Sequence, residues 1–267
     1  MAVIDDLVAA LQASANYRHV NPDLIRHVGE EELGKRRNLK AAIKSTKDKL
    51  HQVGGAFLAA EMPYARWLAD VQAATTPAEL RATCRAIMAH HASMRERLPF
   101  LEDFYAAIFA DLPPIASVLD LACGLHPLAL PWMPLTAEAS YHAYDIYQPM
   151  MDFISAFLPL AGMRGEATTW DISQSLPTTP VDLALLLKAI PTLEQIDKTA
   201  GQRILNEIQA RYLVVSFPCR SLGGKNKGMA DFYEAHFRAL VADKPWSIKR
   251  VLFPTELVFV VHKEPLA

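Results

Sequence analysis

Residues 117–130 read SVLDLACGLHPLAL, and this stretch decides the fold class. An apolar run ends at Asp120 and passes into a turn of small residues between Ala122 and Gly124. Small residues let the backbone approach a ligand closely, and the free N–H groups at the start of a following helix favour an anion. The full G-x-G-x-x-G pattern is missing, because Ala122 and His126 occupy glycine positions. The stretch therefore predicts a nucleotide-type loop between a strand and a helix.

Short apolar runs alternate with helix-like stretches on both sides of this loop, which is typical of βαβ units and a mostly parallel sheet. The runs expected to form strands are 117–121, 141–144, 166–170, 183–187, 212–217, 247–253 and 256–262. The last two are close enough in sequence to form an antiparallel hairpin. This strand plan predicts an α/β, Rossmann-like fold of the class I methyltransferase kind rather than a nicotinamide dehydrogenase.

The sequence before residue 113 has a different pattern. Apolar residues recur every three or four positions, and no alternating β-branched run is present, so this region is expected to be helical throughout. Asn21-Pro22 and Thr76-Pro77 are good helix starts, because Asn and Thr cap helices and Pro is tolerated in the first turn. We expect an N-terminal helical domain over 1–112, followed by a Rossmann-like methyltransferase domain over 113–267.

Composition limits the location of the protein and its partners. The start of the chain lacks a signal peptide, and no apolar run reaches the ~20 residues of a membrane span, so we expect a cytoplasmic protein with no membrane partner. Cys84, Cys123 and Cys219 match neither zinc-ligand nor redox spacing, which predicts reduced thiols and no metal site. The net charge of -2 gives no general attraction to nucleic acid, so DNA binding is not expected and any RNA contact must come from local patches.

One local patch is basic. Between Leu33 and His51, seven Lys and Arg residues accompany a single acid, Asp48. Solvated helix faces often have this composition, and a phosphate-binding surface is the functional alternative. The residues expected to contact RNA are Arg18, Arg26, Lys35, Arg36, Lys40, Lys44, Lys47 and Lys49.

Charged residues follow successive predicted strands. Asp145 lies some 20 residues after the small-residue turn, where an acid can accept hydrogen bonds from ribose hydroxyls. Asp171 ends the next strand and could read an adenine amino group, and Lys188 follows the fourth strand. Each residue alone could equally be a cap, a turn residue or a surface lysine. Acids at successive strand ends favour a shared ligand site.

The fifth strand leads into VVSFPCRSLGGKNKGM (214–229), a glycine-rich cationic loop that suits a clamp on nucleic acid. The residues expected to position the target are Ser216, Arg220, Lys225, Lys227 and Met229. Met229 could instead belong to the core. Cys219 is assigned no catalytic role.

Five stretches carry a resemblance to a known family: ANYRHVNPDLIRHV (15–28), HASMRERL (91–98), VLDLACGLHPLAL (118–130), LLLKAIPTLEQ (185–195) and VSFPCRSLGGKNKGM (215–229). Together they resemble the aminoglycoside-resistance 16S rRNA methyltransferases of the ArmA and Rmt type. The resemblance implies methylation at N7 of guanine 1405 in the decoding site, in helix 44 of 16S rRNA within the 30S subunit. It also implies resistance to gentamicin and kanamycin.

The same resemblance implies the cofactor S-adenosyl-L-methionine, with S-adenosyl-L-homocysteine as product. Arg97 looks like the arginine that holds the methionine carboxylate, and Gly124, Asp145 and Asp171 look like further cofactor contacts. The remaining residues of the expected cofactor site are Ala122, Ile172, Leu187, Lys188 and Gln195. Two positions depart from the family pattern: Met94 replaces a usual threonine, and His126 replaces a usual asparagine.

Guanine N7 has a free lone pair, so the expected catalysis is mainly alignment of a base that is turned out of its helix. Two other functions stay open. A small-molecule methyltransferase would act on free metabolites without ribosomal particles, and a non-catalytic ribosome-binding factor would bind the cofactor without methyl transfer.

Overall fold

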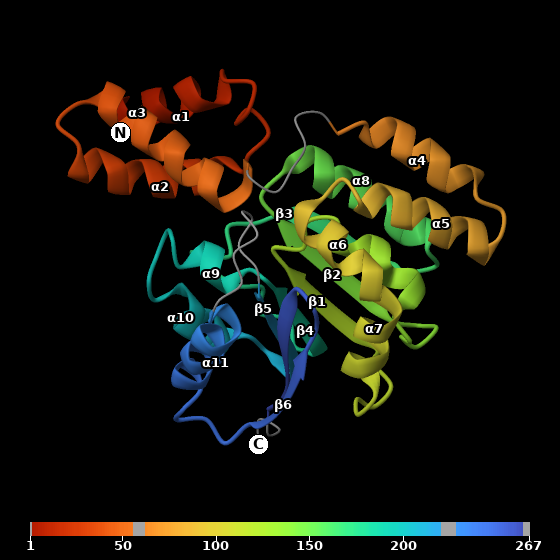
Figure 1. The fold of residues 1–267 in the computed structure, drawn as a ribbon. Helices are drawn as coiled ribbons and strands as arrows, with labels where there is room; N and C mark the ends of the chain where they lie inside the picture. Colours follow the sequence, from red (N-terminus) through yellow and green to blue (C-terminus); the bar gives the residue numbers. More distant parts are fainter. Residues whose placement is uncertain (1, 56–61, 220–227, 264–267) are drawn as a thin grey trace.

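The computed structural model describes residues 2–55, 62–219 and 228–263. Within these residues lies one seven-stranded sheet with the order β3-β2-β1-β4-β5-β7-β6 (Figure 1). The strands are β1 (Ser117–Leu121), β2 (Ser140–Asp145), β3 (Arg164–Thr169), β4 (Val181–Leu187), β5 (Ala210–Pro218), β6 (Ser247–Leu252) and β7 (Glu256–His262). Strands β1 to β5 pair in parallel, and β7 lies antiparallel between β5 and β6. The predicted Rossmann-like α/β fold class is confirmed.

The expected strands are all present, and their bounds differ by a few residues. The spans of β1 and β7 match the prediction, and the antiparallel hairpin of β6 and β7 is confirmed. The largest shift is in β3, which begins at Arg164 and ends at Thr169 rather than spanning 166–170. It pairs with β2 from Ser140↔Arg164 to Asp145↔Thr169, so the partner strand and not the apolar pattern sets its bounds.

Helices occupy the region before the sheet, as predicted, and also connect its strands. Those before β1 are α1 (Ala2–Gln12), α2 (Pro22–Lys35), α3 (Leu39–Leu50), α4 (Tyr64–Ala73), α5 (Pro77–Met88), α6 (Ala92–Arg97) and α7 (Leu101–Phe109), with a π-helical turn at His51–Gly55 and a 3₁₀ turn at Leu98–Phe100. Those after it are α8 (Gln148–Leu160), α9 (Ile190–Leu193), α10 (Ala200–Glu207) and α11 (Met229–Leu240).

Local sequence explains where two of these helices begin. The Asn21 side chain accepts the backbone N–H groups of Asp23 and Leu24 at 2.8 and 3.1 Å, with Pro22 in the first turn of α2. Thr76 and Glu79 form a reciprocal capping box at the start of α5. Both predicted helix starts are confirmed.

The element after β1 is shorter than the helix that the sequence predicts. Residues His126–Trp132 form a 3₁₀ helix that contains Pro131 and has Pro127 in its first turn. Proline lacks the N–H that a continuing α-helix would need. The small-residue loop is therefore not followed by a regular helix whose free N–H groups could bind an anion, and this part of the expectation is wrong.

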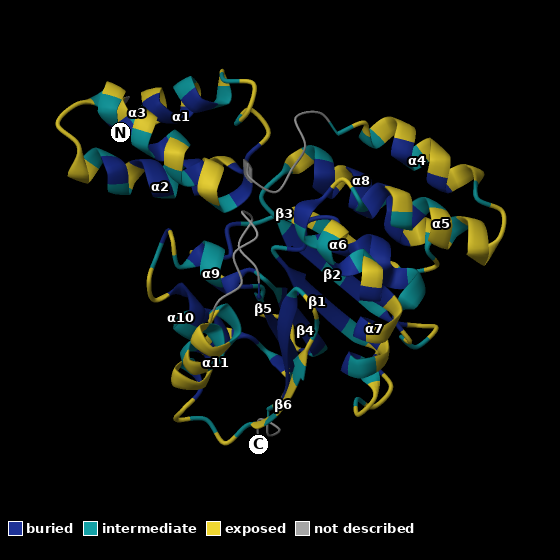
Figure 2. Cartoon of the chain, viewed as in Figure 1, coloured by how far each residue is buried: buried dark blue, intermediate teal, exposed yellow. Residues whose placement is uncertain are grey.

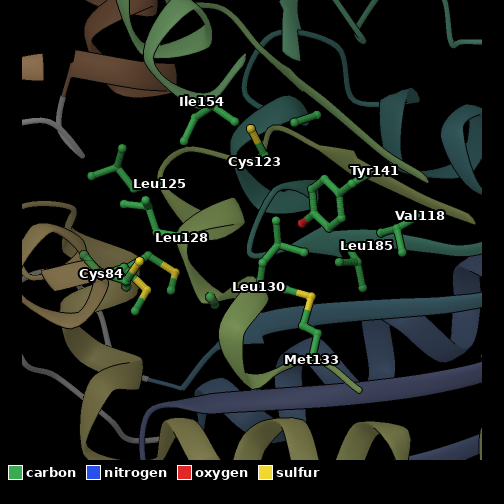
Figure 3. Close-up of a cluster of buried hydrophobic side chains, with 14 of the residues drawn as sticks. Cys84, Val118, Cys123, Leu125, Leu128, Leu130, Met133, Tyr141, Ile154 and Leu185 are labelled. Carbon is green, nitrogen blue, oxygen red and sulfur yellow. The ribbon is translucent and has the colours of Figure 1, made fainter. Parts of the chain in front are cut away.

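Each face of the sheet carries its own hydrophobic core. On one face, α4 to α8 pack on inward side chains such as Val118 and Leu185. Figure 3 shows this core, where Cys84 from α5 and Ile154 from α8 lie with Tyr141 of β2. On the other face, α9, α10 and α11 cover the alternate strand residues. Because successive strand residues point to opposite faces, this two-sided burial follows from the continuous apolar strands.

Helices α1 to α3 and the π-helical turn that follows α3, which together we call the three-helix unit, form a third and smaller core from residues such as Leu7, Ile25 and Leu50. Figures 1 and 2 show this unit beside the sheet domain. It joins the rest through a bridge between Val20 and Tyr147 and through backbone hydrogen bonds around them. By contrast, α4 to α7 share the core of the sheet. A domain boundary after residue 112 stays a prediction.

Candidate active site at the strand ends

A pocket lies at the carboxyl ends of β1 to β4, on the side where the three-helix unit meets the sheet. The space inside it, including open solvent at its mouth, is ≈ 790 Å³. Strand ends contribute Ala122, Asp145, Lys188 and, just beyond β3, Asp171. Ligands of open α/β sheets bind at this edge. Four of the predicted cofactor residues are thus brought to one pocket.

The backbone is unusual at two of these strand ends. Ala122 after β1 and Lys188 after β4 have φ values of 51° and 58°, and β1 and β4 are neighbours in the sheet. Left-handed conformations cost residues with a side chain about 1–3 kcal/mol and gather at ligand sites. The two turns therefore bend away from the sheet at the place where a ligand would lie.

Gly124 occupies a position that needs glycine. Its φ is 53°, and an added Cβ would lie 2.6 Å from the Nε2 atom of His91. Its backbone N–H donates to Oδ2 of Asp145 at 2.8 Å. The turn after β1 is therefore fixed to the acid at the end of β2, and His91 closes the turn from the start of α6.

Asp145 ends β2 with its carboxylate at the pocket wall. Oδ1 accepts the N–H of Ile146 at 2.6 Å, while Oδ2 accepts that of Gly124. Burial raises the pKa of Asp145 to about 6, although both N–H groups lower it and the nearby Asp120 raises it further. These two bonds fix the carboxylate plane, and each oxygen keeps a further acceptor position.

Asp171 also lines the pocket, and two contacts orient its carboxylate. Oδ1 accepts both the backbone N–H (2.9 Å) and the hydroxyl of Ser173. Oδ2 lies 3.3 Å from Nδ1 of His27, which comes from α2 of the three-helix unit. The pocket therefore contains an acid that is held from two separate parts of the fold.

Lys188 connects the pocket to a buried ion network. Its Nζ lies 2.7 Å from Oε2 of Glu96 and 3.6 Å from Oε2 of Glu256. Its backbone N–H donates to the carbonyl and the hydroxyl of Ser216, and that hydroxyl donates to Glu256 at 2.6 Å. The lysine charge is balanced within the protein, and its side chain is fixed beside the pocket.

Arg97 lies in the same network and is 1% exposed. Its guanidinium binds both carboxylate oxygens of Glu256, at 2.6 and 3.0 Å, and its Nη1 donates to the Met94 sulfur at 3.1 Å. It stacks over Phe104, with 4.5 Å to the ring centroid. Arg97 is not among the lining residues of the pocket. Its assignment to the methionine carboxylate stays a prediction.

The other predicted cofactor residues divide between the pocket and the surface. Ile172 and Leu187 line the pocket, as apolar walls for a flat ring. Gly124 supports it through Asp145. Gln195 is exposed and is not a lining residue. The structure thus brings together most of the predicted set.

The residues predicted to position the target lie in different environments. Ser216 is fully buried and binds Glu256, while Met229 begins α11 and is half-buried. Arg220, Lys225 and Lys227 lie outside the described residues. Their roles toward a target base stay predictions.

His126, the departure from the family asparagine, has a structural explanation. Its Nδ1 lies 2.7 Å from Oδ2 of Asp120, and its Nε2 lies 2.7 Å from the Tyr105 hydroxyl. The Tyr141 hydroxyl donates to the same Asp120 oxygen at 2.6 Å. All four side chains are buried. His126 thus links α7 to the strand that leads into the pocket.

The predicted RNA-binding residues fall into two groups. Arg26 pairs with Asp5, Lys35 with Glu31, Arg36 with Glu32, and Lys49 with Glu31 and Glu32. In contrast, Arg18, Lys40 and Lys44 are exposed, and no ion pair of theirs is found in the part of the chain that the structure describes. Lys47 lies over the Tyr17 ring at 5.8 Å. The acids that neutralise the first group, Asp5, Glu31 and Glu32, precede the basic segment in the sequence.

Some site residues could not be found from sequence. Glu256 starts a hairpin strand 159 positions from its partner Arg97, and no motif marks it. Leu24, Val53 and His27 reach the pocket from the three-helix unit. Two of the family stretches give an indication of these regions: HASMRER contains Glu96, and ANYRHVNPDLIRHV contains Leu24 and His27.

The cysteines, the possible metal ligands and the apolar helices bear on other functions. Cys84, Cys123 and Cys219 are free and buried, and burial raises the pKa of the Cys84 thiol to about 12. Within the described residues, no group of three or more His, Cys, Asp or Glu side chains could hold a metal ion. No helix in the same residues is long and apolar enough to cross a membrane.

Comparison with known proteins identifies the family. Residues 13–260 match the model of the ribosomal RNA methyltransferase (FmrO) family. A 16S rRNA (guanine(1405)-N(7))-methyltransferase of Micromonospora rosea is 36% identical over 265 residues, covering 97% of each chain.

Solved structures agree. The 16S rRNA methyltransferase RmtF in complex with S-adenosyl-L-homocysteine is 30% identical, with a TM-score of 0.81 over 97% of this chain and 98% of that one. The 16S rRNA methylase RmtB is 27% identical, with a TM-score of 0.80 over 98% of both chains. The resemblance expected from the sequence is confirmed: the chain belongs to the ribosomal RNA methyltransferase (FmrO) family.

Proposed function

We propose that this protein transfers a methyl group from S-adenosyl-L-methionine to N7 of guanine 1405 in 16S rRNA. One observation carries the proposal: Ala122, Asp145, Asp171 and Lys188, from the ends of four adjacent strands, line a single pocket. That arrangement suits a nucleoside, and the relatives named above carry this activity in their names.

The pocket residues fit the proposed cofactor. Asp145 offers two oriented oxygens to the hydroxyls of a ribose, and Asp171 offers an acceptor to an adenine amino group. Ile172 and Leu187 offer apolar walls to the ring, and Lys188, whose charge Glu96 and Glu256 balance, lines the same pocket. When bound, the cofactor supplies an electrophilic sulfonium methyl group.

The protein needs no strong base for this reaction. Guanine N7 already carries a free lone pair on the major-groove edge, so no proton has to be removed before attack. The tasks left to this chain are to hold the two reactants in line and to exclude water. Cys219 is not needed as a nucleophile, and burial raises the pKa of its thiol.

The three-helix unit supports the proposed target. Arg18, Lys40 and Lys44 are exposed on it, and its Leu24 and Val53 line the pocket. Phosphate contacts from these cations would hold a folded RNA next to the cofactor. We therefore propose the 30S subunit, at helix 44, as substrate, with the guanine turned out of its stack. Ribosomal subunits are cytoplasmic, so this substrate implies a cytoplasmic enzyme. Methylation of the decoding site would confer resistance to gentamicin and kanamycin.

The test is transfer of radiolabelled methyl from the cofactor to purified 30S subunits, followed by mapping of the modified base. We expect label at N7 of guanine 1405, and loss of most of it in Asp145→Asn, which removes a charged acceptor. Label at another nucleotide would contradict the proposed target. Transfer to free metabolites, or cofactor binding without transfer, would contradict the proposed reaction.

A further inference from the structure

His27 stands out because it reaches an acid of the pocket from a different core. It lies on α2, whose apolar side packs within the three-helix unit, while Asp171 follows β3 of the sheet. The Nδ1 of His27 lies 3.3 Å from Oδ2 of Asp171. This pair is a side-chain link between the unit that we propose to dock on RNA and the pocket that we propose to hold the cofactor.

The contacts of Asp171 leave little freedom for its carboxylate. A carboxylate has about four acceptor positions, and Ser173 fills two on Oδ1 with its N–H and its hydroxyl. His27 fills one on Oδ2. One position of Oδ2 remains for a ligand in the pocket that Asp171 lines. Removal of His27 would leave Oδ2 unpaired and the carboxylate held on one side only.

The surroundings of His27 favour its charged form. Asp171, Glu31 on α2 and Asp197 after α9 supply three nearby carboxylates. Against the charged form, the Gln174 amide nitrogen, which is a donor, lies 2.9 Å from its Nε2. One guanidinium is near, that of Arg203, which donates to the Ser173 carbonyl. The hydrogen bond that His27 donates to Asp171 is the main reason that the pKa of His27 lies above its usual value, against the effect of partial burial.

We propose that His27 is a positioning residue for the cofactor pocket: it holds the Asp171 carboxylate in the orientation that an adenine amino group requires, and so couples the three-helix unit to the pocket. The inference rests on the proposed function. It adds His27 to the residues that act on the pocket. It also predicts coupling, because any movement of α2 changes how the Asp171 carboxylate is held. By linkage, a ligand that uses Asp171 also stabilises the position of α2.

The sign of the pH effect follows from the raised pKa. Charged His27 donates a charge-assisted hydrogen bond, which is present below that pKa and weakens as pH rises through it. Neutral imidazole can still donate from one nitrogen, so the loss is partial. We expect affinity for S-adenosyl-L-homocysteine to fall about threefold from pH 6 to pH 8.5, because a charge-assisted hydrogen bond is only modestly stronger than the neutral bond that replaces it.

The experiment measures binding of S-adenosyl-L-homocysteine to the full chain by calorimetry at both pH values. His27→Gln should bind about 3- to 10-fold more weakly at pH 6 and show no fall toward pH 8.5. His27→Lys keeps a cationic donor throughout this range, so it should restore most of the affinity without the pH dependence. His142→Gln is the matched control. The Nδ1 of His142 lies 3.6 Å from Oε1 of Glu166, and His142 is not a lining residue of the pocket, so this variant should leave the affinity and its pH dependence unchanged.

Hydrogen exchange tests the coupling separately. In the wild type, S-adenosyl-L-homocysteine should slow exchange in α2, and this protection should shrink in His27→Gln while that of β1 to β4 remains. Equal affinity and pH dependence in wild type and His27→Gln would overturn the inference alone. A wild-type chain that binds no S-adenosyl-L-homocysteine would overturn the proposed function and, with it, this inference.

Discussion

Two groups of helices precede the sheet in sequence, and they serve different purposes. Helices α4 to α7 bury residues such as Phe104 in the core of the sheet, so they are part of its stability. Helices α1 to α3 bury most of their apolar residues in a core of their own, to which Ile196 and Tyr147 of the sheet domain add, and polar contacts and the Val20–Tyr147 bridge also join them to the sheet. Both groups have helical periodicity and both reach the pocket, through Leu24 on α2 and through His91 and Ser93 at the start of α6, but α4 to α7 share the core of the sheet.

The largest expected effect tests the integration of α7 into the sheet core. Phe104 is fully buried there, so Phe104→Ala should lower the free energy of unfolding of the whole chain by about 3–5 kcal/mol. Denaturant unfolding followed by circular dichroism measures this loss. A loss below about 1 kcal/mol would mean that α7 is not part of the common core.

Ile25→Ala tests the separateness of the three-helix unit. Ile25 is fully buried in the core of that unit, and its truncation should cost about 2–4 kcal/mol. The cost should be local, so amides of α1 to α3 should exchange at least about 30-fold faster while those of β1 to β5 keep their protection. Ile154→Ala, on α8, is the control that should affect the sheet. Uniform loss of protection in Ile25→Ala would remove the distinction between the two groups.

Glu32 should make the stability of the three-helix unit sensitive to acid. It is buried, and contacts with Ser45, Lys49 and Arg36 outweigh its burial and lower its pKa to about 2. A lowered carboxyl pKa stabilises the fold above its unfolded value, and the stabilisation is lost as pH falls toward about 2. The protection of amides in α2 and α3, relative to the intrinsic exchange rate at each pH, should therefore fall between about pH 5 and pH 2.

Glu32→Gln should cost the unit about 1–3 kcal/mol at pH 7 and make its stability nearly independent of pH in that window. Hydrogen exchange of α2 and α3 in wild type and variant, at several pH values, measures both effects. An unchanged acid response in the variant would assign it to another carboxylate.

The smallest effect concerns docking. Lys44→Ala should weaken binding to 30S subunits a few-fold and lower the slope of log affinity against log salt by about 1, because one phosphate contact is lost. Lys35→Ala should do less, since Lys35 is paired with Glu31. Filter binding at several salt concentrations compares them. Equal slopes for both variants and the wild type would exclude this surface from docking.

Sequence predicted the elements better than their association. Alternating apolar runs gave all seven strands, and Asn21 and Thr76 gave two helix starts, because these patterns are local. The split of the helical region depends on which apolar faces meet, and periodicity carries no such information. β3 depends on its neighbour for its bounds.

The site shows the same limit. Asp145, Asp171 and Lys188 were found because parallel strand ends converge by topology. Glu256 and His27 were not found, because each acts through a partner more than 140 positions away. The family resemblance assigned Arg97 to the cofactor, and in the structure its guanidinium is paired with Glu256.

The place of β7 has a consequence for protein synthesis. Arg97 and Lys188 are made long before Glu256, the buried carboxylate that binds both from the start of β7. Without that carboxylate the buried Arg97 guanidinium would lose its acid partner and Lys188 would keep Glu96 alone, and a buried charge without a partner is costly. The nascent chain can therefore complete this edge of the sheet only after β7 has emerged and inserted beside β5. A polypeptide released before that point would retain its N-terminal helices but would lack the carboxylate that holds Arg97 and Lys188 beside the pocket.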